Sequence, residues 1–310
     1  MKYGMPYKGS KNKLAGKIFE LFPRKKNFYD LFCGGCSMTH YGLLHGGFEN
    51  FYMNDINPAC SELFMDAVHG KFKDEKRWIS REDFERLKDI EPYVAFCWSF
   101  GNNLRDYIYG KDREEIKRAW HYAIFFDDFE PFKKFGVDMS AIKGIKNLYK
   151  KYLTSKDILR KCRLEAGKGL QSCEGLFRLQ SLESLERLER LERLERLRIT
   201  VGSYDQVEIV PDSVIYCDIP YEDTDVYTQD KKQDFNFEKF YSWCEKQTEP
   251  LFISSYKMPA DRFVCVAMFK HRCTLSATEN VEVTEKVYIP KHQEKEYHLP
   301  GSLFNFGEMM

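Results

Sequence analysis

Four consecutive residues, Asp218-Ile219-Pro220-Tyr221, follow the short apolar run VIYC. A turn of this composition can hold a flat base, because the Asp218 carboxylate and the Ile219 carbonyl can accept hydrogen bonds from an exocyclic amine while Tyr221 stacks on the ring. Holding both amine protons makes an aromatic amine a better nucleophile, which alkylation of adenine at N6 requires. Without support from elsewhere in the chain, the same residues also fit an ordinary Asp-x-Pro turn.

A glycine pair, Gly34-Gly35, follows Asp30 and Phe32, and Asp55 comes 21 residues after Gly34. Glycines at a strand end let the backbone approach a ligand, and a carboxylate at the end of the next strand can accept hydrogen bonds from ribose hydroxyls. The full G-x-G-x-x-G pattern is absent, which argues against a nicotinamide cofactor. The pattern leaves either another adenosine-containing ligand or a plain glycine turn.

Strand and helix patterns surround these residues and predict how they are positioned. Residues 28–33 and 48–55 are predicted strands, and each leads into a predicted helix, the second opened by Asn57-Pro58 and closed by Gly70. Further strands are predicted at 213–218, 251–255, 262–270 and 285–290, with a helix around 235–247. The β-α-β-α order predicts an α/β fold with a parallel sheet that binds its ligand at the strand ends.

The predicted sheet is interrupted by charged helical segments. We expect a catalytic domain formed by residues 1–70 and 205–310, and an inserted, mostly helical module at 71–204. Within the insertion, residues 182–198 repeat Leu every third position, so the leucines wrap around a helix instead of forming one apolar stripe. Favourable Glu-before-Arg spacings predict a solvated helical spacer there.

The composition of the 310 residues fits a globular protein: 43% are hydrophobic, and 48 Lys+Arg balance 48 Asp+Glu. Collagen-like and disordered classes are thereby excluded. There is no uncharged apolar run of 18 residues and no signal-like opening, so we expect a cytoplasmic protein without membrane contact, its ten cysteines reduced. Basic residues are dense at 1–30 and 141–168, where they form either solvated faces or phosphate contacts.

Taken together, these motifs resemble the Dam family of DNA N6-adenine methyltransferases (D12 class), particularly phage-encoded members, in the order of the alpha group. The resemblance rests on Tyr7-Lys8-Gly9-Ser10-Lys11, on Asp30 to Ser37, on Asp55 and on Asp218 to Tyr221. Weaker similarities are Tyr204-Asp205, FGNNLRDYIYG, FISSYKMP and TEKVYIP. The family implies a Rossmann-like, S-adenosylmethionine-dependent sheet with an inserted target-recognition region.

The resemblance also implies roles for individual residues. Catalysis is assigned to Asp218, Ile219, Pro220 and Tyr221, and cofactor binding to Tyr7, Lys11, Asp30, Phe32, Gly34, Gly35, Asp55, Asp205 and Asp218. The implied reaction transfers a methyl group to N6 of an adenine flipped out of double-stranded DNA, by a monomer without a metal. Candidate phosphate contacts are Lys143, Lys146, Lys150, Lys151, Lys156, Arg160, Lys161 and Arg163.

Two positions depart from the family pattern. Ile219 replaces the first proline of the usual Asp-Pro-Pro-Tyr, which keeps the carbonyl but loses the fixed φ of the ring, and Cys36 stands where many members have a third glycine. The pair Cys33 and Cys36 has the spacing of a redox or zinc pair, but no second pair accompanies it, so we interpret it as packing.

The sequence excludes one other methylation chemistry and leaves two alternatives open. No proline precedes a cysteine, which excludes the Pro-Cys nucleophile of cytosine-C5 methylation. An RNA adenine methyltransferase remains an alternative, since that group often carries Asn-Ile/Leu-Pro-Tyr. The second alternative is a DNA-binding homologue with impaired catalysis, in which Ile219 marks the loss of activity.

Overall fold

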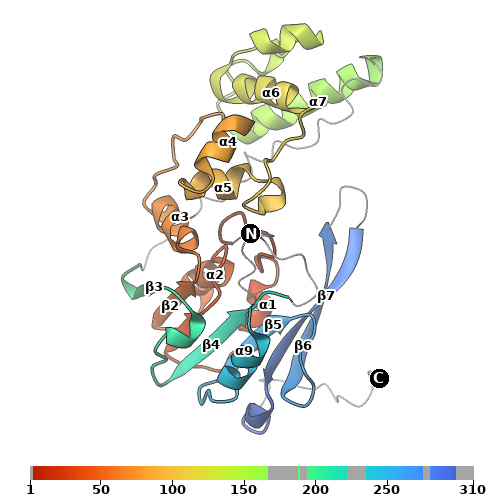
Figure 1. Cartoon of the computed structure of the whole chain (residues 1–310). Helices are drawn as coiled ribbons and strands as arrows, with labels where there is room; N and C mark the ends of the chain where they lie inside the picture. Colours follow the sequence, from red (N-terminus) through yellow and green to blue (C-terminus); the bar gives the residue numbers. More distant parts are fainter. Residues whose placement is uncertain (1–2, 167–187, 189–193, 222–234, 275–279, 298–310) are drawn as a thin grey trace. The chain divides into compact units, whose positions relative to one another are not determined.

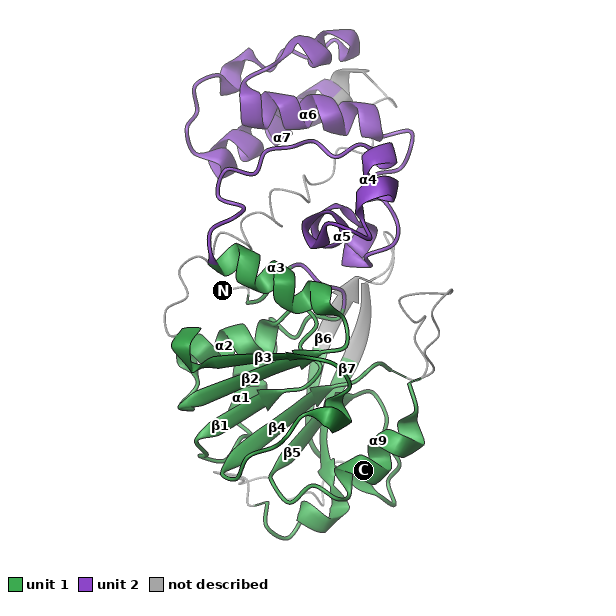
Figure 2. Cartoon of the chain, turned by 60° about the vertical axis from the view of Figure 1, so that its left-hand side comes forward, with its two compact units in different colours: residues 1–5, 9–68, 188–310 green, residues 6–8, 69–187 purple. Residues whose placement is uncertain are grey.

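The computed structural model describes residues 3–166, 188, 194–221, 235–274 and 280–297, and the chain forms two compact units (Figure 1). Unit 1 comprises Met1–Met5, Gly9–Val68 and Leu188–Met310, and unit 2 comprises Pro6–Lys8 and His69–Arg187 (Figure 2). Each unit has its own arrangement of elements and is described by itself.

Unit 1 is built on a seven-stranded sheet with the order β3-β2-β1-β4-β5-β7-β6. Neighbouring strands from β3 to β5 are parallel, whereas β7 runs antiparallel to both β5 and β6. The strands are β1 Asn27–Asp30, β2 Asn50–Asp55, β3 Leu197–Val201, β4 Ser213–Asp218, β5 Leu251–Ser255, β6 Phe263–Thr274 and β7 Asn280–Pro290. This is the Rossmann-like α/β architecture that the motifs predicted.

The register of the central strands brings three carboxylates to one edge of the sheet. Asp30 ends β1 and pairs with Met53 of β2 and Tyr216 of β4. Asp55 and Asp218 each lie two residues further along those strands, at their carboxyl ends. Because parallel strands end at the same edge, that edge is the expected ligand site.

One face of the sheet is covered by α1 (Ala15–Phe19) and α2 (Ser37–His45) through aromatic contacts. The rings of Phe19 and Phe28 lie 5.0 Å apart, and those of Phe22 and Phe252 lie 4.8 Å apart. These aromatic side chains are large apolar surfaces whose burial stabilises the sheet. They hold the segment before α1, which carries Lys11, next to the strand ends.

The other face is covered by α9 (Phe237–Cys244), which begins at the N-cap residue Asn236. Phe240 and Tyr241 of this helix share a buried cluster with Tyr29 and Ile215 of the sheet. Asn236 accepts a hydrogen bond from the Lys239 amide at 2.9 Å, which satisfies one of the amides left free at a helix start. A further helix of unit 1, α3 (Pro58–Val68), follows β2.

Unit 2 is helical in its described residues. Its helices are α4 Arg81–Leu87, α5 Pro92–Trp98, α6 Glu114–Phe126 and α7 Leu148–Ala166, with 3-10 turns at Phe100–Asn102, Glu130–Phe135 and Ser140–Ile142. The core between α6, α7 and the two later turns contains Trp120, whose ring stacks on Tyr152 and whose Nε1–H donates to Ser155 at 2.7 Å. The helical character expected of the insertion is therefore present here.

The boundaries of the two units differ from the expected ones. Residues 197–201, which the sequence pattern assigns to the insertion, form β3 and pair with β2 in the sheet, so unit 1 resumes at Leu188 and not at 205. The predicted helical spacer at 182–198 is wrong at its end, where Leu194–Arg196 is a 3-10 turn and Leu197 begins a strand. Parallel pairing with β2 overrides the local helix propensity there. Residues 182–187 and 189–193 of the repeat lie outside the described residues.

Within the described part of the chain, no helix has both the length and the apolar character needed to cross a membrane.

Asn54 offers a test of how the strand ends are held together. Its buried amide donates to the carbonyls of Leu31 and Gly202, both at 3.1 Å, and accepts from the Thr200 hydroxyl at 2.8 Å. We expect Asn54→Ala to lower the free energy of unfolding by about 1–3 kcal/mol in urea denaturation, because a buried carbonyl loses its donor. Thr200→Val is the control: it removes the exposed partner, and we expect it to cost less than about 1 kcal/mol. Equal losses in the two variants would contradict this account.

Candidate active site

Lys11 and Asp218 form the centre of the site although they are 207 residues apart in the chain. Lys11 Nζ lies 2.7 Å from Asp218 Oδ1 and donates to Oδ2 at 2.9 Å. The ammonium also donates to the Gly9 carbonyl at 3.2 Å. The Lys11 carbonyl accepts the first amides of α1, from Leu14 and Ala15. The start of α1 thus fixes the lysine at the carboxyl end of β4.

Tyr221 and Glu285 complete the polar cluster. The Tyr221 hydroxyl accepts from Lys11 Nζ at 2.7 Å and donates to Glu285, whose two oxygens lie 2.8 and 2.9 Å away. Glu285 Oε2 is also 3.7 Å from Lys11 Nζ. We name this set of four residues, Lys11, Asp218, Tyr221 and Glu285, the carboxylate–lysine cluster.

Glu285 is a site residue that the sequence analysis missed. It lies in the TEKVYIP segment, which resembles the family as a whole segment and does not by itself indicate a role for Glu285. A signal was present: Glu285 has the same strand parity as Val287 and Ile289, which are buried side chains of β7. A carboxylate in phase with buried apolar residues is uncommon and points to a charged partner inside the protein.

Three members of the cluster, Asp218, Lys11 and Tyr221, have raised pKa values. Burial raises the pKa of Asp218 to about 6, against the opposing effect of Lys11 and with the help of the Glu285 charge. For Lys11, burial works against the charged form, but Asp218 and Glu285 outweigh it and the pKa is raised. Burial, with both carboxylates nearby, raises the pKa of Tyr221 far above its usual range. At neutral pH Lys11 is therefore an ammonium, Asp218 is mainly a carboxylate and Tyr221 is a neutral phenol.

The turn after β4 places its residues in different surroundings. The Ile219 side chain is buried in the apolar cluster beneath the site, with Phe240 and Met258, whereas Pro220 is exposed. The Tyr221 ring lies 4.2 Å from that of Tyr256, tilted by 39°. The isoleucine that replaces the family's proline thus contributes buried apolar surface, which a proline in the same place would reduce.

The glycine loop is tied to Asp55. Asp55 Oδ2 accepts from the Gly34 amide at 2.8 Å, and its Oδ1 accepts from the Asn57 amide at 2.9 Å. Gly34 has φ +45°, and Cys36 has φ +55°, a left-handed conformation in which glycine is far less strained than cysteine. The absent third glycine is therefore replaced by a residue that adopts the conformation glycine favours.

Asp30 supports the loop from inside the protein. Its carboxylate is 1% exposed and accepts from both the amide and the hydroxyl of Thr39, at 3.1 and 2.7 Å. Burial raises the pKa of Asp30 to about 7, although the two Thr39 donors oppose the shift. The geometry shows Asp30 orienting the start of α2; its direct contact with a cofactor stays a prediction.

An aromatic wall flanks the glycine loop. Phe32 stacks on Tyr204 with ring centroids 5.3 Å apart, and Phe235 lies 5.8 Å from Phe32. Asp205 accepts from Ser203 and pairs with Lys239 at 2.6 Å, which lowers its pKa. Tyr204 thus lies in the apolar core with the half-buried Phe32 packed against it, while the Asp205 carboxylate is engaged by a neighbouring lysine.

Among the predicted catalytic and cofactor-binding residues, Tyr7 alone lies in unit 2. Its ring lies 5.6 Å from that of Phe96, in the same unit. The structure brings Lys11, Asp218 and Tyr221 together, and it joins Gly34 to Asp55. The expected contact of Tyr7 with the cofactor stays a prediction.

Cys33 and Cys36 are free thiols whose sulfur atoms lie 3.7 Å apart in the buried part of the loop. Burial raises the pKa of both thiols, so thiolates are disfavoured there. Among the residues that the structure describes, no group of three or more His, Cys, Asp and Glu side chains is arranged to hold a metal ion.

One of the candidate phosphate contacts in unit 2 is wrong. Lys151 is buried and pairs with Asp127 at 2.7 Å, so its ammonium is not on the surface. The exposed members of the set are Lys143, Lys146, Lys150, Arg160 and Lys161, with Lys156 half-buried. The Arg163 side chain lies outside the described residues. The remaining basic residues occupy the segment before α7 and the helix itself.

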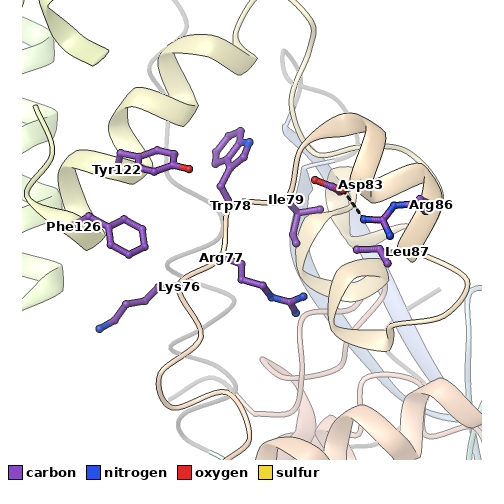
Figure 3. A pocket seen from close by; sticks show the side chains of 9 residues that line it. All are labelled: Lys76, Arg77, Trp78, Ile79, Asp83, Arg86, Leu87, Tyr122 and Phe126. Carbon is purple, nitrogen blue, oxygen red and sulfur yellow. Dashed lines mark hydrogen bonds and ion pairs between the residues drawn. The ribbon is translucent and has the colours of Figure 1, made fainter. Parts of the chain in front are cut away.

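Unit 2 also contains a cavity of about 360 Å³ (Figure 3). The segment Lys76–Ile79 runs between Tyr122 and Phe126 of α6 on one side and residues of α4 on the other. The two arginines that line the cavity are paired with acids. Arg77 pairs with Glu75 and Glu91, and Arg86 pairs with Asp83 at 2.7 Å. The lining therefore combines aromatic and aliphatic side chains with charged ones, and both of its arginines are paired with acids.

The edge of the sheet suits a ligand that carries an aromatic ring, ribose hydroxyls and positive charge. Asp55 is only half-buried, so its carboxylate at the end of β2 can meet a ligand. Asp218 is 22% exposed, and the Phe32 and Tyr204 rings lie beside the loop. These donors and acceptors fit an adenosine-containing sulfonium compound.

Comparison with known proteins agrees with this geometry. The family model described as D12 class N6 adenine-specific DNA methyltransferase matches residues 7–243, more than half of the chain. No curated protein matches the chain. The matched range includes the glycine loop, Asp55 and the turn after β4, and it ends before β5 and Glu285. Methyltransferases in general use S-adenosylmethionine.

Gly4 tests whether the glycine loop forms the cofactor site. Its φ is +72°, and an added Cβ would lie 2.3 Å from the Gly35 carbonyl oxygen and 2.7 Å from the Ser37 backbone. Gly4→Ala must therefore displace the loop, and we expect the Kd for S-adenosylmethionine to rise about tenfold or more in calorimetry, since such strain costs roughly 1–3 kcal/mol. Gly47→Ala, where the added Cβ meets nothing within 4 Å, should bind normally. An unchanged Kd in Gly4→Ala would argue against this location.

Proposed function

We propose a catalytic arrangement for this chain, which belongs to the D12 class N6 adenine-specific DNA methyltransferases and methylates adenine in DNA at N6. In this arrangement the Asp218 carboxylate and the Ile219 carbonyl each accept a hydrogen bond from the N6 amine of the target adenine. The observation that carries the proposal is the partly exposed Asp218 carboxylate at the end of β4, held by the buried Lys11. No backbone group can replace that charged acceptor.

The adenine has to leave the duplex to reach this turn, because its amine is paired inside the helix. Tyr221 would then stack on the extrahelical base, its ring held by the contact with Tyr256 and by the hydroxyl hydrogen bonds. With both amine protons held, the N6 lone pair is freer to form the new bond to carbon. The Asp218 carboxylate would take the proton that the amine sheds.

The cofactor of the proposal is S-adenosylmethionine, which supplies an electrophilic methyl group when bound. Asp55 would accept hydrogen bonds from the ribose, and the loop at Gly34 and Gly35 would let the backbone approach the ligand. Phe32 would border its adenine. Tyr7, Lys11, Asp30, Asp205 and Asp218 keep the cofactor roles that the family resemblance implied.

Unit 2 is proposed to read the DNA sequence. The exposed basic set before and within α7 supports the binding of unit 2 to DNA, because lysines and arginines that neutralise phosphates position a protein on the duplex. The reading of the sequence is what the family resemblance implies for the inserted region. The match to a DNA-specific family favours DNA over the RNA alternative. The monomeric state, the cytoplasmic location and the relationship to phage enzymes of the alpha group remain proposals.

Replacement of Asp218 tests the catalytic assignment. Loss of one pre-organised electrostatic partner typically costs about 2.7–4 kcal/mol, so we expect Asp218→Ala to lower single-turnover methylation on the order of a hundred- to thousandfold. In the unaltered enzyme, kcat/KM should fall as the pH drops through about 6, because the Asp218 pKa lies there and the protonated acid no longer accepts the amine protons. Asp261→Asn, an exposed carboxylate on the same unit, serves as the control. Wild-type rates in Asp218→Ala would refute the assignment.

The salt dependence of DNA binding tests the role of unit 2. We expect Lys146→Gln and Lys150→Gln each to reduce the slope of log affinity against log salt by about 0.9 if the side chain neutralises one phosphate. Lys151→Gln is the internal comparison: it should lower the unfolding temperature, since it leaves Asp127 without its partner, and leave the slope unchanged. If the slope is the same in all three variants, the exposed set is only a solvated face.

A further inference from the structure

Glu285 is a buried charged residue that the arrangement above does not use. It is 2% exposed, lies on β7 and falls outside the residues that the family model matches. Burying a carboxylate is costly unless it is paired and hydrogen-bonded, so its position requires a compensating partner. Its partners here are Tyr221 and Lys11, two members of the carboxylate–lysine cluster.

Hydrogen-bond accounting shows that Glu285 has a specific task at Tyr221. Lys11 can only donate, so its 2.7 Å contact to the Tyr221 hydroxyl makes that oxygen an acceptor. The single proton of the hydroxyl must then point to a carboxylate: both Glu285 oxygens lie within 2.9 Å of the hydroxyl oxygen, and Asp218 is a further hydrogen-bond partner. Glu285 thus offers the hydroxyl two acceptors on the side of β7 and helps to hold the Tyr221 ring in place.

Charge accounting shows a second task, at Lys11. One ammonium is shared by two carboxylates, Asp218 at 2.7 Å and Glu285 at 3.7 Å. With Glu285 present, the Lys11 ammonium interacts with both carboxylates and not with Asp218 alone. If Glu285 were neutral, the ammonium would concentrate on Asp218 and compete with the hydrogen bonds that Asp218 must accept.

We propose that Glu285 is a positioning residue of the methyl transfer: it orients Tyr221 and shares the charge of Lys11, so that Asp218 keeps acceptor capacity for the adenine amine. The inference rests on the catalytic role of Asp218 proposed above. Glu285 touches neither the base nor the reacting atoms, and acts through its two neighbours.

The first test is the pH profile of methylation by Glu285→Gln. The amide oxygen still accepts from Tyr221, but the negative charge is gone, so Asp218 loses a like charge and the acid limb of kcat/KM should move to lower pH. We expect kcat to fall about tenfold with KM for DNA nearly unchanged, the size of one lost charged hydrogen bond. The titratable groups that act on Asp218 are Lys11, Asp30, Tyr216, Cys217, Tyr221 and Glu285.

Lys286→Gln is the matched control, because it is the next residue of the same strand and contacts no member of the cluster in the described interactions. It should keep both the rate and the acid limb of the unaltered enzyme. A Glu285→Gln enzyme that unfolds at a lower temperature but keeps the wild-type acid limb would show a merely structural role and overturn the proposal.

The second test needs no activity and uses a double-mutant cycle in thermal unfolding at pH 8. Lys11→Met leaves two buried carboxylates without their cation, so it should lower the unfolding temperature strongly. Adding Glu285→Gln to Lys11→Met removes one of these charges, and we expect the double variant to unfold at a higher temperature than Lys11→Met. Additive losses would show that Glu285 and Lys11 do not share charge and would overturn the proposal.

Failure of the catalytic assignment is distinguishable from failure of this inference. An active Asp218→Asn enzyme would remove the role of Asp218, whatever the cycle shows. An inactive Asp218→Asn enzyme, combined with an unshifted acid limb in Glu285→Gln, would refute the role of Glu285 alone.

Discussion

The structure of the site depends on a single ammonium buried against the carboxylates of two separate strands. Lys11 lies 2.7 Å from Asp218 at the end of β4 and 3.7 Å from Glu285 on β7, and its charge opposes the rise in the pKa of Asp218 that burial causes. The same contact fixes the segment before α1 to the sheet. The surroundings of the Asp218 carboxylate are therefore set by residues far from it in the sequence.

The parallel sheet supplies the second constraint. Since β1, β2 and β4 run in one direction, their acidic ends meet at one edge, but each acid does different work there. Asp30 is buried and orients α2, Asp55 holds the Gly34 amide, and Asp218 remains partly exposed. Burial and hydrogen bonding, not residue type, decide which carboxylate supports the backbone and which one is available to a substrate.

Unit 2 shows the same separation between supporting and available charge. Lys151 and Lys150 are neighbours in a basic run, yet one pairs with Asp127 inside the unit and the other is exposed. Around the cavity in Figure 3, both arginines are similarly engaged by acids. A count of basic residues therefore overstates the charge that is free to meet phosphate.

The sequence by itself determined the strands of the sheet other than β3, the glycine loop, the place of Asp55 after a strand and the turn at Asp218, because these follow from short patterns of burial and turn chemistry. Only the tertiary structure decided that β3 belongs to the sheet, that Lys151 is buried and that Glu285 joins Lys11 and Tyr221. These features depend on pairing between distant segments, which local periodicity does not encode. The strand parity of Glu285 marked it as buried, but its partners could be found only once the sheet had brought β4, β7 and the segment before α1 together.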